Sequence, residues 1–170
     1  MEKTAVQKLA GALKVLVTIT LVCNLVALLL VPGMSLMKGP EQLLALTPYE
    51  NPLEVPLRVG IAFVLSWGWV WTAGVYEVVL ALFLLFCGIC TAVILWQGRR
   101  VLGTILTGAP FRAENGVSLR RAAVCCFLIA AAALARVVWG LFYYGSIAPL
   151  LTYNALFVPI FILGGLLCLV

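Results

Sequence analysis

The chain has 170 residues, of which 65% are hydrophobic and 10% charged, and it carries a formal net charge of +5. A water-soluble domain is about half apolar and about a quarter charged, so this composition excludes a soluble fold and indicates an integral membrane protein. Histidine and aspartate are absent from the sequence, which excludes histidine-based catalysis and most transition-metal sites, and we expect neither a metal nor a cofactor.

Residues 13–31 form the first long apolar stretch, after a basic N-terminal flank. Roughly 20 apolar residues cross a bilayer, so this stretch predicts the first transmembrane helix. It is longer than the apolar core of a cleaved signal peptide and lacks a small-residue cleavage site.

The sequence that follows holds five prolines between positions 32 and 58. Because proline at this density prevents a long helix, residues 32–72 are expected to form a loop on the outer side.

A second apolar stretch covers residues 59–96. As one helix it would be about 57 Å long, nearly twice the hydrocarbon thickness of a bilayer. Tryptophan is enriched at the interface between membrane and water, and this stretch contains Trp67, Trp69 and Trp71. We therefore expect a tryptophan-rich segment at the outer interface, followed by a second transmembrane helix over residues 73–96.

The polar connection over residues 97–120 is expected to be partly helical. Apolar residues between positions 99 and 107 fall on one helical face, which predicts that the second helix continues along the interface. Gly108 and Pro110 would end that helix, and a new helix is predicted to start near Arg112.

This new helix is expected to continue into a third transmembrane span over residues 121–144. After a short turn, residues 150–170 form a fourth apolar stretch and predict a fourth span. A membrane helix normally ends in a polar flank, whereas this sequence is still hydrophobic at Val170. We therefore expect the natural chain to continue beyond that residue.

The distribution of basic residues predicts the orientation. Three lysines lie in the N-terminal flank and five arginines in segment 97–121, whereas the other two connections carry few basic residues. Because basic residues favour the cytoplasmic side, both termini and segment 97–121 are expected in the cytoplasm. The predicted fold class is an all-α protein with four transmembrane helices, located in the bacterial cytoplasmic (inner) membrane, in contact with the lipid bilayer.

Glu77 and Arg136 are the two full charges expected well within the spans. An intramembrane charge is costly and usually faces a partner or the interior of a helix bundle. Both residues lie on helical faces rich in small side chains, which suggests an intramembrane ion pair. The pair could fix the register of two helices, or it could serve a small transporter or channel subunit. Alternatively, the two charges could extend separately to the outer headgroups without pairing.

Cys87 and Cys90 form a C-x-x-C pattern inside the second predicted span. Such a pair could act as a membrane thiol oxidoreductase, which is the only enzymatic alternative that the sequence offers. No basic residue is close in sequence to activate either thiol, and buried cysteine mostly behaves as a small hydrophobic residue. We therefore expect a protein that is not an enzyme.

The cytoplasmic connection contains the pattern G-x-P-F-x-x-E-N-x-x-x-L-R, formed by Gly108, Pro110, Phe111, Glu114, Asn115, Leu119 and Arg120. This pattern, together with four spans and a long first outer loop, resembles a bacterial domain-of-unknown-function family, the YoaS-like membrane proteins. The resemblance implies no chemistry. It implies a regulatory setting, because genes of this family often lie beside small helix-turn-helix regulators.

The leading hypothesis is a non-enzymatic interaction or regulatory protein that acts through its cytoplasmic segment 97–121. A simple tether could have any polar sequence, so the candidate contact residues are those of the pattern: Pro110, Phe111, Glu114, Asn115, Leu119 and Arg120. We expect a protein partner there, linked to a helix-turn-helix regulator through the resemblance, and no direct binding of nucleic acid. A homo-oligomer is expected if the bundle forms a transport path.

Overall fold

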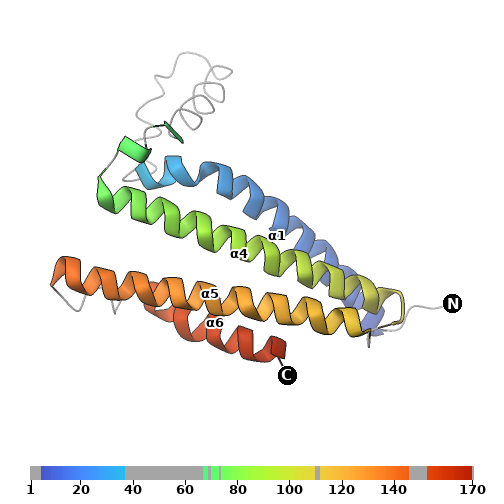
Figure 1. Ribbon diagram of the computed structural model, residues 1–170. Coiled ribbons are helices and arrows are strands. Elements are labelled where there is room, and N and C mark those ends of the chain that lie inside the picture. Colours follow the sequence, from blue (N-terminus) through green and yellow to red (C-terminus); the bar gives the residue numbers. More distant parts are fainter. Residues whose placement is uncertain are drawn as a thin grey trace, which may run out of the picture. The chain divides into compact units, whose positions relative to one another are not determined.

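The computed structural model describes residues 5–36, 67–68, 70–72, 74–109, 112–145 and 153–169. The secondary structure of these residues is helical (Figure 1). Most of the expected outer loop, together with Trp69, lies outside the described residues. The helical elements are α1 (Ala5–Leu36), the short 3-10 helix η1 (Val70–Thr72), α4 (Val75–Leu106), α5 (Ala113–Tyr144) and α6 (Tyr153–Leu169).

Three of these helices are long and apolar enough to cross a membrane, over Ala5–Pro32, Val75–Leu106 and Ala113–Tyr143. Helix α6 is apolar but shorter, with 17 residues and a length of about 26 Å. Over the described residues, the prediction of an all-helical protein is therefore confirmed, with three helices that are long and apolar enough to be membrane spans. Sidedness and a fourth complete span remain predictions.

The chain divides into two compact units, Met1–Leu25 with Cys87–Val170 and Val26–Phe86, which we call unit 1 and unit 2. In unit 2, Val31, Val70 and Ala81 form a buried apolar cluster, with two leucines of α4 packed against it. The Trp67 indole donates a hydrogen bond to the Leu29 carbonyl at 3.1 Å. This bond anchors a ring that is otherwise 38% exposed, an arrangement that suits tryptophan at an interface.

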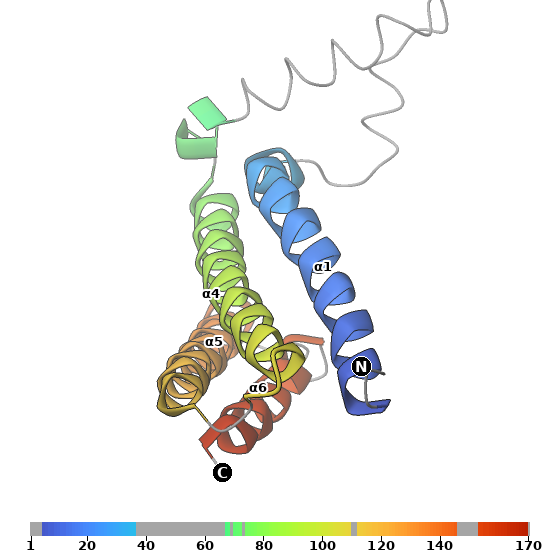
Figure 2. The same cartoon turned by 90° about the vertical axis from the view of Figure 1, so that its right-hand side faces the viewer.

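In unit 1, α5 and α6 lie side by side (Figure 2). The buried face of α5 is made largely of small residues: Ala122, Ala123, Cys126, Ala130 and Ala133. Small side chains let membrane helices approach closely. Gly165 of α6 shows how close this approach is, because a Cβ atom there would lie 2.9 Å from the Phe127 ring of α5.

The N-terminal part of α1 and the C-terminal part of α4 also lie in unit 1 and run antiparallel. Asn24 Nδ2 donates to the Gly88 carbonyl at 2.9 Å, so this amide forms an interhelical hydrogen bond within the apolar region. Further along the pair, a Cβ atom on Gly11 would lie 3.7 Å from Leu106. The start of α1 therefore lies beside the end of α4 (Figure 1).

Candidate functional site

The connection between α4 and α5 is a short turn within a helical hairpin. Helix α4 ends at Leu106, and Gly108 adopts the left-handed conformation with φ of 74°. The Gly108 amide donates to the Ile105 carbonyl at 3.1 Å, and the Ala109 amide donates to the Thr104 carbonyl at 3.0 Å. These two bonds form a Schellman cap, whose left-handed position favours glycine. The predicted helix end at Gly108 is confirmed.

Helix α5 begins at Ala113, after Arg112 in extended conformation. The predicted start near Arg112 and the continuation into a long apolar helix are therefore confirmed. Most of the predicted 97–120 loop is helix, since only residues 107–112 separate α4 from α5. We call residues 97–121 the hairpin tip.

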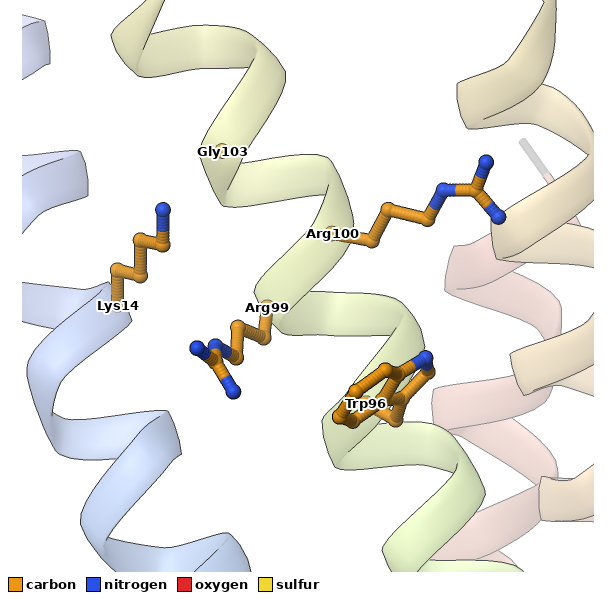
Figure 3. A pocket seen from close by; sticks show the side chains of 5 residues that line it. All are labelled: Lys14, Trp96, Arg99, Arg100 and Gly103. Atoms are coloured by element: carbon orange, nitrogen blue, oxygen red, sulfur yellow. The ribbon is translucent and has the colours of Figure 1, made fainter.

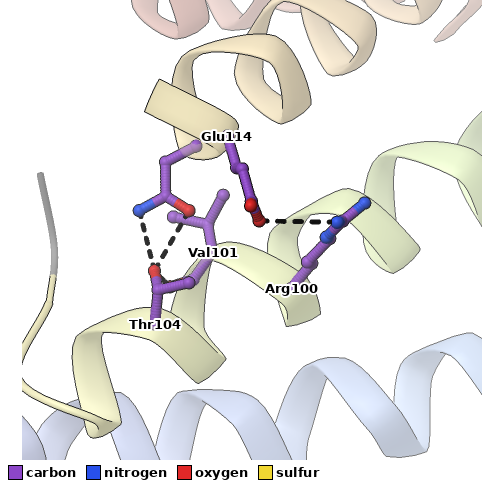
Figure 4. Close-up of polar contacts among 5 residues, drawn as sticks. Arg100, Val101, Thr104 and Glu114 are labelled. Carbon is purple, nitrogen blue, oxygen red and sulfur yellow. Dashed lines mark hydrogen bonds and ion pairs between the residues drawn. The ribbon is translucent and has the colours of Figure 1, made fainter. Parts of the chain in front are cut away.

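Asn115 joins the two helices of the hairpin tip. Its side chain is buried, and Asn115 Nδ2 donates to the Thr104 hydroxyl at 2.7 Å. The single hydroxyl proton of Thr104 is shared between the Val101 carbonyl at 2.7 Å and Asn115 Oδ1 at 3.1 Å (Figure 4). A buried amide that is bonded in this way fixes one helix against the other.

A second polar contact crosses the hairpin tip at Arg100 and Glu114. The guanidinium and carboxylate groups lie 3.6 Å apart, and both side chains are more than half exposed (Figure 4). An exposed ion pair of this kind contributes little stability. The Glu114 carboxylate also lies in the first turn of α5, where the helix dipole favours a negative charge. Glu114 therefore has favourable charge interactions with Arg100 and with the start of α5, and its side chain stays largely exposed.

Two further polar side chains of the hairpin tip are buried, Gln97 at 8% exposure and Ser118 at 3%. Within the described part of the chain, Gln97 Oε1 has no hydrogen-bond partner. A buried acceptor without a partner costs free energy. Gln97 is therefore a weak point in the packing of the hairpin tip.

The predicted contact residues fall into three groups. Asn115 fixes α5 against α4 and Glu114 forms an exposed ion pair with Arg100, whereas Leu119 and Arg120 are exposed on α5. Pro110 and Phe111 lie outside the described residues. The sequence interpretation missed Thr104, the partner of Asn115. The signal that could have revealed this partner is the predicted helix end at Gly108. A helix that ends there and a second helix that starts near Arg112 are joined by a short turn, which brings Thr104 and Asn115 close together.

Glu77 lies in the first turn of α4, in unit 2. The Val78 amide donates to the Gly74 carbonyl at 3.2 Å, which makes Gly74 the residue that starts the helix. The Glu77 carboxylate folds back over this start, because a Cβ atom on Gly74 would lie 2.5 Å from Glu77 Oε2. An acidic side chain in this position stabilises a helix N-terminus. Glu77 therefore has a structural function that needs no second charge.

Arg136 lies on α5 in unit 1 and is half-buried, near enough to Cys87 of α4 for an electrostatic interaction. Because Glu77 and Arg136 belong to different units, their pairing stays a prediction. Cys87 and Cys90 both occur as free thiols, and the redox alternative also stays a prediction.

Comparison of the chain with models of protein families, with curated proteins and with solved structures gives no match in any of the three. The interpretation of the hairpin tip therefore depends on its own geometry.

Proposed function

We propose that the chain is a multi-pass protein of the bacterial cytoplasmic membrane that acts without enzymatic activity, by binding a protein partner through its hairpin tip. The observation that carries this proposal is the hydrogen bonding between Asn115 and Thr104. A connector that only links two spans needs no buried polar lock between its helices. A binding surface needs one, because a rigid surface loses less conformational entropy on association.

The lengths of the helices support a projecting tip. Helices α4 and α5 have 32 residues each, or about 48 Å, against about 30 Å of hydrocarbon. Roughly 18 Å of each helix therefore lies outside the hydrocarbon if the helices are upright. The arginines at positions 99, 100, 112, 120 and 121 favour placing this excess at the hairpin tip and on the cytoplasmic side.

The exposed surface of the tip combines apolar and basic side chains. On α5, Val117 is 53% and Leu119 37% exposed, and the neighbouring Arg120 and Arg121 are exposed as well. Such a surface suits a partner with an apolar patch bordered by acidic residues. The resemblance to a family encoded beside helix-turn-helix regulators suggests that the partner belongs to a regulatory system.

Photo-crosslinking from two adjacent positions tests the proposal. A crosslinking amino acid at Val117, which is exposed, is expected to form a protein adduct in intact cells. The same amino acid at Ser118, which is 3% exposed, is the matched control and should form none. If Val117 gives the same pattern as Ser118, the tip is only a connector.

The hydrogen bonding between Asn115 and Thr104, which we call the lock, provides a second test. Asn115→Ala should weaken the Val117 adduct, because the tip loses the bond that fixes its two helices. Thr107→Ala is the control, since the hydrogen bond that the structure describes for the Thr107 hydroxyl goes to the Thr104 carbonyl at the end of α4 and does not cross to α5. An adduct that is insensitive to both variants would contradict a function of the lock in binding.

A further inference from the structure

A basic hollow lies in unit 1 between the start of α1 and the end of α4. It is lined by Lys14, Trp96, Arg99, Arg100 and Gly103 and has a volume of about 420 Å³. The side chains of Lys14 and Arg99 point into the space between the two helices (Figure 3). A Cβ atom on Gly103 would lie 3.6 Å from Lys14 Nζ, so the ammonium group lies directly over the glycine.

Two of the three cations in this hollow have no acidic partner in the part of the chain that the structure describes. The Arg100 guanidinium points toward α5 and pairs with Glu114. Among the residues that the structure describes, no carboxylate pairs with Lys14 or Arg99. The hollow therefore holds two uncompensated positive charges from two different helices.

Trp96 adds an aromatic wall to the hollow. The Arg99 guanidinium lies over its ring at 5.8 Å from the centroid, and the indole is 56% exposed. Stacking on the ring holds the guanidinium in place and leaves its N–H groups available for an anion. Tryptophan beside basic residues is typical of the headgroup region of a membrane.

An apolar hollow adjoins the basic one and shares Lys14 with it. It has a volume of about 370 Å³, and its other lining residues are Gly11, Val15, Thr18, Ile19 and Leu106. Val15 and Ile19 are more than half exposed, so the apolar hollow opens toward the surroundings of α1. The Thr18 hydroxyl donates to the Lys14 carbonyl at 2.7 Å and therefore presents no free donor. Next to the two charges lies a surface suited to a hydrocarbon chain.

We propose that these two hollows bind one anionic phospholipid. The phosphate of the headgroup lies between Lys14 and Arg99, and an acyl chain runs along Val15 and Ile19. Guanidinium and ammonium groups form strong, charge-assisted hydrogen bonds with phosphate oxygens. Basic pockets between membrane helices bind such headgroups for this reason. The site includes Arg99 and Gly103 of the hairpin tip, but it uses none of the exposed residues of α5 that form the proposed surface for the partner.

A soluble phosphate compound shares the headgroup chemistry, and the apolar hollow separates the two ligands. A free phosphate needs only Lys14 and Arg99, whereas a lipid also uses the surface at Val15 and Ile19. The experiment therefore has to vary the charge, the apolar surface and the form of the phosphate independently.

Native mass spectrometry of the full chain in mild detergent measures this binding directly. Phosphatidylglycerol is the anionic probe and phosphatidylcholine, which has no net charge, is the reference. Lys14→Gln and Arg99→Gln should each weaken phosphatidylglycerol binding about fivefold and leave phosphatidylcholine unchanged. Arg112→Gln is the matched control, because Arg112 is an exposed arginine of the same region that lines neither hollow.

Two more variants keep the test decisive if the charge changes disturb folding. Gly103→Leu changes no charge and improves helix propensity, but its side chain fills the basic hollow beside Lys14. It should weaken phosphatidylglycerol binding as well. Ile19→Ser makes the apolar hollow polar and should weaken the binding of phosphatidylglycerol. Millimolar inorganic phosphate should not displace this lipid from the natural chain.

Equal binding of the two lipids, or equal losses in Lys14→Gln, Arg99→Gln and Arg112→Gln, would overturn the proposal. Displacement of phosphatidylglycerol by millimolar inorganic phosphate, with no effect of Ile19→Ser, would also overturn it, because the site would then serve a soluble phosphate. Preferential binding of phosphatidylglycerol that depends on Lys14, Arg99 and Ile19 supports it.

Discussion

Asn115 Nδ2 of α5 donates a hydrogen bond of 2.7 Å to the Thr104 hydroxyl of α4 across the turn of the helical hairpin. Asn115 is 6% exposed, so its amide is removed from water, and the bond to Thr104 satisfies one of its donors. Thr104 is in turn held by its bond to the Val101 carbonyl one turn earlier. The two helices are therefore fixed to each other near their ends, beyond the arginines that mark the edge of the apolar region.

The first prediction concerns this bond. Asn115→Ala should lower the free energy of unfolding by about 1–3 kcal/mol, because the Thr104 hydroxyl loses its buried donor. Thr104→Val should have a similar effect, and the double variant should cost less than the sum of both. Thermal unfolding in detergent, followed by circular dichroism, measures all three. Additive losses would show that the two side chains do not depend on each other.

The second prediction has the opposite sign. Gln97 is 8% exposed, and its Oε1 atom has no partner among the described residues. Gln97→Met has nearly the same volume and removes the unsatisfied acceptor, so it should raise the free energy of unfolding by about 1 kcal/mol. Gln97→Glu is the contrasting variant and should destabilise the protein, because it buries a charge. A loss of stability in Gln97→Met would show that Gln97 Oε1 has a partner after all, such as a bound water molecule.

Much of the fold could be predicted because membrane helices leave a strong signal in composition. Gly108 marked the end of one helix and Arg112 the start of the next, and both were confirmed because backbone conformation near glycine and proline is a local property. The bounds of the spans were harder. Helix α4 continues to Leu106, as the apolar face over positions 99–107 predicts, so the end of the helix does not mark the end of the span, and the span bounds stay predictions. Arginines do not break a helix, and their long side chains can reach the headgroups.

The partners of individual side chains could not be predicted. The sequence pattern predicts a contact residue at Asn115, and in the structure its side chain bonds to Thr104 and fixes α4 against α5. The position of Glu77 in an apolar stretch predicts one half of an intramembrane pair, and in the structure Glu77 lies at a helix start, where its charge stabilises the helix end. Such partners depend on the relative rotation of helices, and an apolar surface that is nearly uniform around each helix does not encode this rotation.

The third prediction compares two glycines. A Cβ atom on Gly165 would lie 2.9 Å from the Phe127 ring, whereas one on Gly98 would meet nothing within 4 Å. Gly165→Ala should therefore lower the free energy of unfolding by about 1–3 kcal/mol through overpacking. Gly98→Ala should raise it by about 0.5–1 kcal/mol through helix propensity. Thermal unfolding of both variants in the same detergent provides the comparison.

A second substitution, at Phe127, tests whether overpacking causes the loss of stability expected for Gly165→Ala. Phe127→Leu removes the ring atoms that a new methyl group would meet, so Gly165→Ala should cost less in that background than in the natural sequence. An unchanged cost would indicate that the glycine serves another purpose than close approach of α6 to α5.

The last prediction tests the orientation that the proposed function requires. A cysteine at Val117, on the exposed face of α5, should react with an impermeant thiol reagent only when the cytoplasmic side is open. Trp71 is 54% exposed and belongs to the segment that we expect at the outer interface. A cysteine at this position should therefore react with the reagent from the outside in intact cells. The six natural cysteines are replaced beforehand, so that each labelling signal comes from one position. Labelling of the Val117 cysteine in intact cells would place the hairpin tip outside, where it could not meet a cytoplasmic regulator, and the proposed function would then fail together with the topology.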